Sequence, residues 1–233
     1  MNNSKHETMI YVGAWSMLLF AILYVGLTMV INNLAQSQTM LYGMEEHNLF
    51  KVAMGTMTIR TLLVIYGVMP LLLIPAAVGC FYAFIEPHEA QMRCGMYFAT
   101  AGALALSLSL LMIPSINWHL VSYIPNLTGD VRAAMIINLQ GIHSYFGVFV
   151  GDILGLGSIL VWFFITSLVM LRTSVIPHIM GVIELIIAIV AALLLILRYT
   201  GLIPMLYSNI QAPGLIALWL FLCGISLMSL RKD

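Results

Sequence analysis

The sequence predicts an all-α fold: a polytopic membrane bundle of six transmembrane helices with a small helical extracytoplasmic cap. Hydrophobic residues make up 62% of the 233 residues and charged residues only 8%, whereas soluble domains carry about 25% charged residues. The mean hydropathy is strongly positive, at +1.04. Apolar runs of the length that a helix needs to cross the hydrocarbon, about 20 residues, recur along the chain. We therefore expect residues 1–233 to form a single integral membrane domain.

The expected spans follow one another along the whole chain. The first apolar run is longer than the apolar region of a cleavable signal peptide, about 7–15 residues, so we expect it to remain as the first span. Pro70 and Pro75 predict a kink in the second span, because proline cannot donate the helical hydrogen bond. The six expected spans are 9–31, 61–85, 94–114, 146–171, 178–198 and 213–230.

The distribution of Lys and Arg favours an orientation with both termini in the cytoplasm, because cytoplasmic loops carry an excess of these residues. In this orientation five of them lie on the cytoplasmic side and four on the far side. The two groups are Lys5, Arg93, Arg172, Arg231 and Lys232 against Lys51, Arg60, Arg132 and Arg198. The sequence thus predicts an N-in/C-in topology.

Two stretches outside the spans continue in helical character. Residues 44–60 carry apolar side chains at steps of three and four, and residues 129–143 open with Asp130, a good N-cap. A helix from 130 to 172 would be about 64 Å long, roughly twice the hydrocarbon thickness. It must project from the membrane or break at its surface, and Gly141 offers a place to break. We expect both stretches to pack together as the cap.

Asp152 lies in the stretch FGVFVGDILGLG, residues 146–157. Counting back from Arg172 places it about 30 Å away, near the extracytoplasmic boundary. The same count places Arg60 and Arg198 at this level. Three interpretations stay open: an ion pair with Arg60 or Arg198, the lining of a polar cavity for a substrate or ion, or contact with water.

His143 is the histidine nearest to this stretch. It precedes Asp152 by nine residues, which at about 100° per residue puts the two on opposite sides of an α-helix. We therefore expect no dyad of these side chains. His143 is instead in register with Gly147, Gly151 and Gly155, a row of small residues that allows another helix to approach closely.

Glu184 is isolated in the apolar run GVIELIIAIV of the fifth span. An isolated ion is costly in lipid. One interpretation is a carboxyl that is protonated or hydrogen-bonded to a Ser, Thr or Tyr of a neighbouring helix. The other is a residue that relays protons or cations.

Catalytic signatures for zinc proteases, serine hydrolases and nucleotide-binding enzymes are missing from the sequence. Residues 45–47, Glu-Glu-His, could form a metal site with His119 or His143 only if the cap brought them together. We expect no metal and no other cofactor. The cysteines lie in or beside apolar runs and are interpreted as reduced, packed thiols; they are Cys80, Cys94 and Cys223.

The C-terminal third resembles a family of bacterial multi-pass membrane proteins that is catalogued as a domain of unknown function. The resemblance lies in LRTSVIPHIMGVIELI and PGLIALWLFLCGISL. The matching positions are Arg172, Pro177, Gly181, Trp219, Leu220 and Gly224. The resemblance implies a six-helix protein of the bacterial inner membrane and carries no activity or site residues.

Two functions are expected from these residues. The first is a non-enzymatic membrane protein that binds a lipid or a small apolar ligand, or serves as a partner subunit or homo-oligomer, through a polar site at the outer helix ends. The alternative is a small proton- or ion-coupled transporter that uses Asp152 and Glu184. An enzyme ranks behind both for want of a nucleophile and base. The formal net charge of zero gives no sign of a nucleic-acid partner.

Overall fold

The structure is a computed structural model that describes residues 3–35, 57–199 and 205–230. Nearly all of these residues are helical, and the all-α bundle is confirmed. The helical elements join end to end into six rods. The rods are α1 (Asn3–Ala35); α3 (Met57–Val68) with η1 (Met69–Leu72) and α4 (Leu73–Ala83); α5 (Ile85–Leu111) with η2 (Ile113–Asn117) and α6 (Trp118–Tyr123); α7 (Gly129–His143) with η4 (Ser144–Leu156) and α8 (Gly157–Arg172); α9 (His178–Tyr199); and α10 (Met205–Ser229). A short 3₁₀ turn, η3 (Ile124–Asn126), precedes α7.

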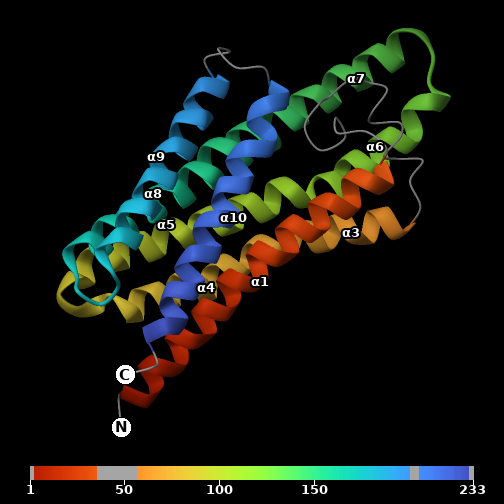
Figure 1. The fold of residues 1–233 in the computed structure, drawn as a ribbon. Helices are drawn as coiled ribbons and strands as arrows, with labels where there is room; N and C mark the ends of the chain where they lie inside the picture. The colour runs from red at the N-terminus through yellow and green to blue at the C-terminus, as the bar shows by residue number, and fades with distance from the viewer. Residues whose placement is uncertain (1–2, 36–56, 200–204, 231–233) are drawn as a thin grey trace.

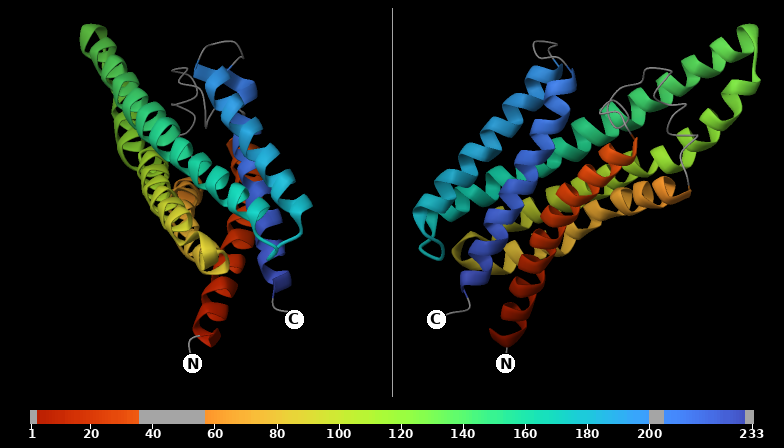
Figure 2. Two further views of the ribbon diagram at one scale, coloured as in Figure 1. Left: turned by 90° about the vertical axis from the view of Figure 1, so that its left-hand side faces the viewer. Right: turned by 45° about the vertical axis from the view of Figure 1, so that its right-hand side comes forward.

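Five of the rods contain helices long and apolar enough to cross a membrane, judged over the described residues. These segments are His6–Val30, Met57–Ala83, His88–Leu120, Gly129–Arg172 and His178–Leu197. The expected sixth span falls in α10, whose apolar segment Gly214–Ser229 is shorter. The first helix begins and the last helix ends at the same end of the bundle (Figures 1 and 2), as an even number of spans requires.

The surface of the bundle carries large apolar side chains on every rod. Examples are Trp15, which is 53% exposed, Ile22 at 63%, Leu108 at 60% and Ile186 at 55%. Such side chains are stable at a surface that contacts lipid, whereas contiguous apolar patches of this extent are rare on soluble monomers. The described residues therefore have a surface compatible with insertion into a membrane.

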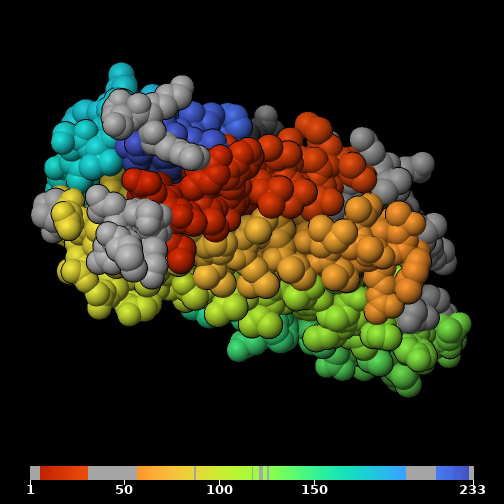
Figure 3. Space-filling view, turned by 90° about the horizontal axis from the view of Figure 1, so that it is seen from below, coloured from red at the N-terminus to blue at the C-terminus, as the bar shows by residue number. Residues whose placement is uncertain are grey.

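The rods pack most closely where glycines meet. A Cβ atom on Gly13 of α1 would lie 2.5 Å from the Cα atom of Gly79 in α4. On another side of α1, a Cβ on Gly224 of α10 would lie 3.1 Å from the Leu18 side chain. Figure 3 shows α1 lying along the α3–α4 rod on one face of the molecule. Because glycine has no side chain beyond a hydrogen atom, the backbone of α1 can come into close contact with α4 and α10.

Aromatic side chains fill the centre between α8 and α10. The rings of Phe163 and Trp219 stack with their centroids 3.8 Å apart, and Trp162 packs edge-on against Trp219 at 5.7 Å. The indole nitrogen of Trp219 donates a hydrogen bond to the hydroxyl of Ser167 at 3.3 Å. All four side chains are completely buried, so this cluster fixes α10 on α8.

The second rod changes helix type at the first of the two prolines for which the sequence predicted a kink. The α-helix gives way to the 3₁₀ segment η1, with Pro70 near its start, and resumes at Leu73. Proline lacks the amide hydrogen for the regular bond, which explains the change of helix type. Met69, Pro70 and Leu73 of this stretch are all buried inside the bundle.

The rod from Gly129 to Arg172 is continuous over 44 residues. Gly141, suggested as a break, lies inside α7 and interrupts nothing. With α6 this rod forms an arm that projects beyond the ends of α1 and α3 (Figures 1 and 2). The arm has its own small apolar cluster around Ile124 and Leu139, both 1% exposed. The other expected part of the cap, residues 44–56, lies outside the described residues.

Candidate functional site

A cavity of about 130 Å³ lies between α1, the α3–α4 rod, α5, the α7–α8 rod and α10. Its walls are mostly apolar, with side chains such as Phe20, Leu73, Leu106, Met112 and Leu156. Polar side chains join them from five different elements. These are Tyr24 of α1, Tyr66 of α3, Ser109 of α5, His143 of α7 and Asp152 of η4.

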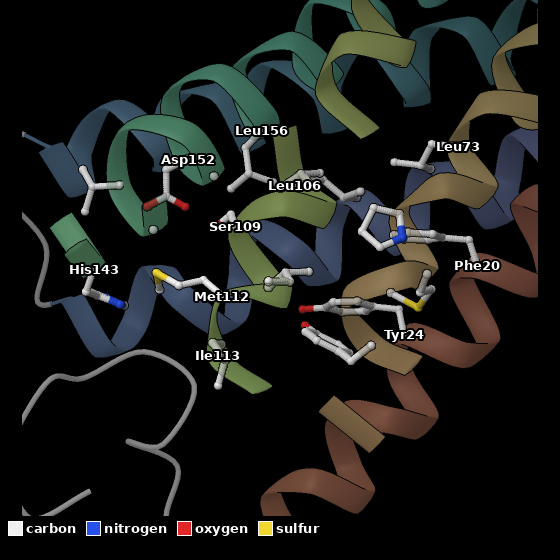
Figure 4. A pocket seen from close by; sticks show the side chains of 18 residues that line it. Phe20, Tyr24, Leu73, Leu106, Ser109, Met112, Ile113, His143, Asp152 and Leu156 are labelled. Atoms are coloured by element: carbon white, nitrogen blue, oxygen red, sulfur yellow. The ribbon is translucent and has the colours of Figure 1, made fainter. Parts of the chain in front are cut away.

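The polar groups are unevenly distributed along the cavity. Asp152, Ser109 and His143 lie toward one end, and Phe20 and Leu73 lie toward the other (Figure 4). Tyr24 lies between them and next to Tyr66, whose ring centroid is 6.0 Å away. The cavity therefore offers an apolar compartment at one end and hydrogen-bonding groups with a carboxyl at the other.

His143 and Asp152 line the same cavity, so the prediction that they lie on opposite sides of their helix was wrong. The reason is the helix type. Residues Ser144–Leu156 form a π-helix, in which hydrogen bonds run from i to i+5 and a turn takes about 4.4 residues. Nine residues then make about two complete turns, and the two side chains return to one side. π-Helices are rare, and most are single-turn bulges inside α-helices.

Asp152 lies in the wall of a cavity that is enclosed by several rods. Its cavity is shared with Phe20 and Leu73, which lie in the central parts of α1 and of the second rod. The carboxyl thus lies within the bundle and is half-buried.

The row of glycines behaves partly as predicted. A Cβ on Gly151 would meet the Ser109 side chain of α5 with its Cβ at 2.9 Å, and one on Gly155 would meet Leu106 at 2.8 Å. These two glycines therefore allow α5 to approach closely. Gly147 serves a different purpose, because a Cβ there would lie 3.2 Å from the His143 ring of its own helix. The small residue leaves room for the imidazole at the cavity wall.

Gly151→Ala is expected to destabilise the fold by about 1–3 kcal/mol, because the new methyl group overlaps Ser109. The double variant Gly151→Ala with Ser109→Gly is expected to regain most of this loss, since the second change removes the obstructing atoms. Thermal unfolding of the full chain in detergent measures both effects. Simple addition of the two single effects would contradict the contact.

Arg60 is bound elsewhere. Its Nε donates to the carbonyl oxygen of Pro114 at 3.1 Å, and its guanidinium lies over the Trp118 ring, 5.5 Å from the centroid. Within the described residues Arg60 forms no ion pair with Asp152. The side chain of Arg198, the other expected partner, lies outside the described residues, as do residues 45–47. Of the two arginines expected to form an ion pair with Asp152, Arg60 therefore does not do so.

Glu184 is completely buried in α9, and among the described residues neither carboxyl oxygen has a hydrogen-bond partner. The expected bond to a neighbouring Ser, Thr or Tyr is thus not formed there. The carboxyl lies within electrostatic range of the Cys223 thiol of α10. Glu184 does not line the cavity that contains Asp152, so the two acidic residues belong to separate places in the bundle.

Glu184→Met is expected to stabilise the protein by about 1–3 kcal/mol, because it replaces a buried polar group that lacks a partner with an apolar group of similar shape. Thermal unfolding in detergent measures the change. Glu7→Met, at an exposed position of α1, is the matched control and is expected to change stability by less than about 0.5 kcal/mol. A lower unfolding temperature for Glu184→Met would mean that the carboxyl makes a stabilising contact.

The tyrosines and Ser109 were not among the sequence-predicted site residues. Each is a polar group inside an apolar run, as Asp152 is, and that signal alone could have selected them. No three of His, Cys, Asp and Glu gather closely enough for a metal ion in the part of the chain that the structure describes. Comparison of the chain with family models, with curated proteins and with solved structures finds no match.

Proposed function

We propose that the chain is a multi-pass protein of the bacterial inner membrane that binds a small amphipathic ligand in the cavity beside Asp152. The single observation that supports this function is the uneven lining of the cavity. Apolar walls around Phe20 and Leu73 face a polar end formed by Asp152, His143 and Ser109. Binding sites for small molecules combine a mostly apolar lining with a few convergent polar groups in this way.

The size of the cavity limits the ligand. At about 130 Å³ it is close to an engineered cavity of about 150 Å³ that takes up one benzene molecule. The ligand, or the part of it inside the bundle, is thus about one six-membered ring or a short branched chain. Asp152 accepts hydrogen bonds, so the polar head is one that donates them, such as an amine or a hydroxyl group.

The proposed location rests on the resemblance of the C-terminal third and on the apolar rods. With both termini in the cytoplasm, the α6–α7 arm lies on the extracytoplasmic side. The alternative of an ion-coupled transporter that uses Asp152 and Glu184 has less support, because Glu184 does not line the cavity. A partner subunit or a second copy could in addition cover the apolar surface.

A series of benzyl compounds tests the binding function. Benzylamine, benzyl alcohol and toluene share one ring and differ in the head group. With the full chain in lipid nanodiscs we expect saturable binding of benzylamine and benzyl alcohol with Kd on the order of 0.1–1 mM. Toluene is expected to bind about tenfold more weakly, because it has no head group that forms a hydrogen bond at the polar end.

Two tryptophan variants separate binding in the cavity from partition into lipid. Met112→Trp fills the cavity, which Met112 lines from the end of α5, and is expected to abolish saturable binding. Leu104→Trp places the same ring at an exposed position of α5, where leucine is 49% exposed, and is expected to leave binding unchanged. Equal binding by both variants, or equal affinity for toluene and benzylamine, would refute the proposal.

A further inference from the structure

Two cysteines that are far apart in the sequence meet in the interior of the bundle. The Sγ atoms of Cys80 in α4 and Cys223 in α10 are 3.8 Å apart. Both side chains are completely buried. The third cysteine, Cys94, is exposed on α5, although the sequence predicted it to be packed. The chain thus contains a buried pair of thiols and an exposed single thiol.

The close approach of the thiols follows from the packing around α1. Gly79 precedes Cys80 and lies against Gly13 of α1, and Gly224 follows Cys223 and lies against Ala14 and Leu18 of α1. The glycines hold α4 and α10 against the same helix at neighbouring positions. The cysteine side chains next to them therefore point into one small space. Small residues on three helices thus determine the distance between the two Sγ atoms.

We propose that Cys80 and Cys223 are a redox-active dithiol, which closes to an intramolecular disulfide between α4 and α10 by passing its electrons to a lipid-soluble quinone. In this step both S–H bonds break and one S–S bond forms. The two electrons and two protons pass to the quinone, which becomes the hydroquinone. A disulfide has an S–S bond of about 2.05 Å, so the sulfur atoms must approach one another by less than 2 Å from their present 3.8 Å.

The burial of the pair determines which oxidant can reach it. Both thiols lie in the apolar core with no exposed surface, so an oxidant meets them only when the surrounding helices separate transiently, and then from the lipid. Glutathione and other charged thiol reagents stay in water. A quinone dissolves in lipid and accepts two electrons together with two protons, which matches what a dithiol releases. Glu184 of α9 lies within electrostatic range of Cys223.

The disulfide would connect two helices that also form the cavity. Cys80 follows Leu73 in α4, and Cys223 follows Ile216 in α10, each by about two helical turns, and Leu73 and Ile216 both line the cavity. The dithiol is nevertheless independent of the proposed ligand. It concerns different side chains and can be tested in the absence of any benzyl compound.

The experiment exposes the full-length protein in membranes to decylubiquinone or to oxidised glutathione. The protein is then denatured in the presence of a maleimide and its intact mass is measured. With the quinone we expect one maleimide in place of three and a peptide that joins Cys80 to Cys223. The pair is expected to be lost at least about tenfold faster than Cys94, because only the pair has a partner thiol close enough for an intramolecular disulfide. Oxidised glutathione is expected to leave the pair fully labelled.

Three variants complete the experiment. Cys94→Ser is expected to leave disulfide formation unchanged, whereas Cys80→Ser and Cys223→Ser each leave both remaining thiols labelled. The wild-type peptide map does not depend on whether these variants fold. Three maleimides on the quinone-treated wild-type protein, or loss of Cys94 at the rate of the pair, would overturn the proposal and would leave the ligand-binding function untouched.

Discussion

Replacing Gly13 by alanine is expected to destabilise the protein by about 3 kcal/mol or more, the largest effect on stability among the variants considered. The new Cβ would lie 2.5 Å from the Cα atom of Gly79 and 3.0 Å from the carbonyl oxygen of Pro75. Both atoms belong to backbone, so no side chain can rotate to make room. Only separation of α1 from α4 relieves the overlap, and the contacts along their interface weaken with it.

The matched control is Gly26→Ala on the same helix, where a Cβ would meet nothing within 4 Å. We expect this variant to unfold within about 0.5 kcal/mol of the wild-type protein. Thermal unfolding in one detergent, followed by circular dichroism and by the monomer peak in gel filtration, compares the two. If both variants unfolded at the same temperature, the backbone contact between α1 and α4 would not exist.

Asp152→Asn is expected to weaken the binding of benzylamine about 10- to 100-fold, because a hydrogen bond to a charged group contributes about 1.5–3 kcal/mol. The amide keeps the shape of the side chain and removes its negative charge. Binding of toluene, which has no polar head, is expected to change by less than about twofold. This difference between the two probes distinguishes a head-group contact from general damage to the cavity.

Asp130→Asn makes the same chemical change at an exposed position at the start of α7. It lies in the same continuous rod and outside the cavity. We expect it to bind both probes as the wild-type protein does, in titrations under the same conditions. A parallel loss of toluene and benzylamine binding in Asp152→Asn would assign the aspartate to the structure of the cavity wall.

Most of the fold was accessible from the sequence because it follows from the lengths of apolar runs. The lengths of these runs depend on local composition. The change of helix type at Pro70 is also local, because proline lacks a hydrogen-bond donor. The continuous rod from Gly129 to Arg172 was also anticipated as one alternative. The suggested break at Gly141 was wrong because a glycine inside a helix weakens it by only about 1 kcal/mol relative to alanine, which neighbouring helical turns readily offset.

The residues that form the site were harder to predict from the sequence than the fold, mainly because the helix type could not be predicted. Every argument from spacing assumed an α-helix, which separates His143 from Asp152, whereas the π-helix over Ser144–Leu156 brings both to the cavity. Nothing in the glycine row distinguishes the two helix types in advance. The contact of Arg60 with Pro114 and Trp118 joins different rods and could not be deduced from charge and depth alone. The meeting of Cys80 with Cys223 likewise requires three-dimensional packing.

The arm formed by α6 and α7 has a mechanical consequence. Its rod runs without interruption from Gly129 through His143 and Asp152 to Arg172. The tip of the arm and the polar end of the cavity therefore belong to one continuous helical rod, which lies against α5 at Gly151 and Gly155. A force applied to the tip outside the bundle would shift the imidazole and the carboxylate together.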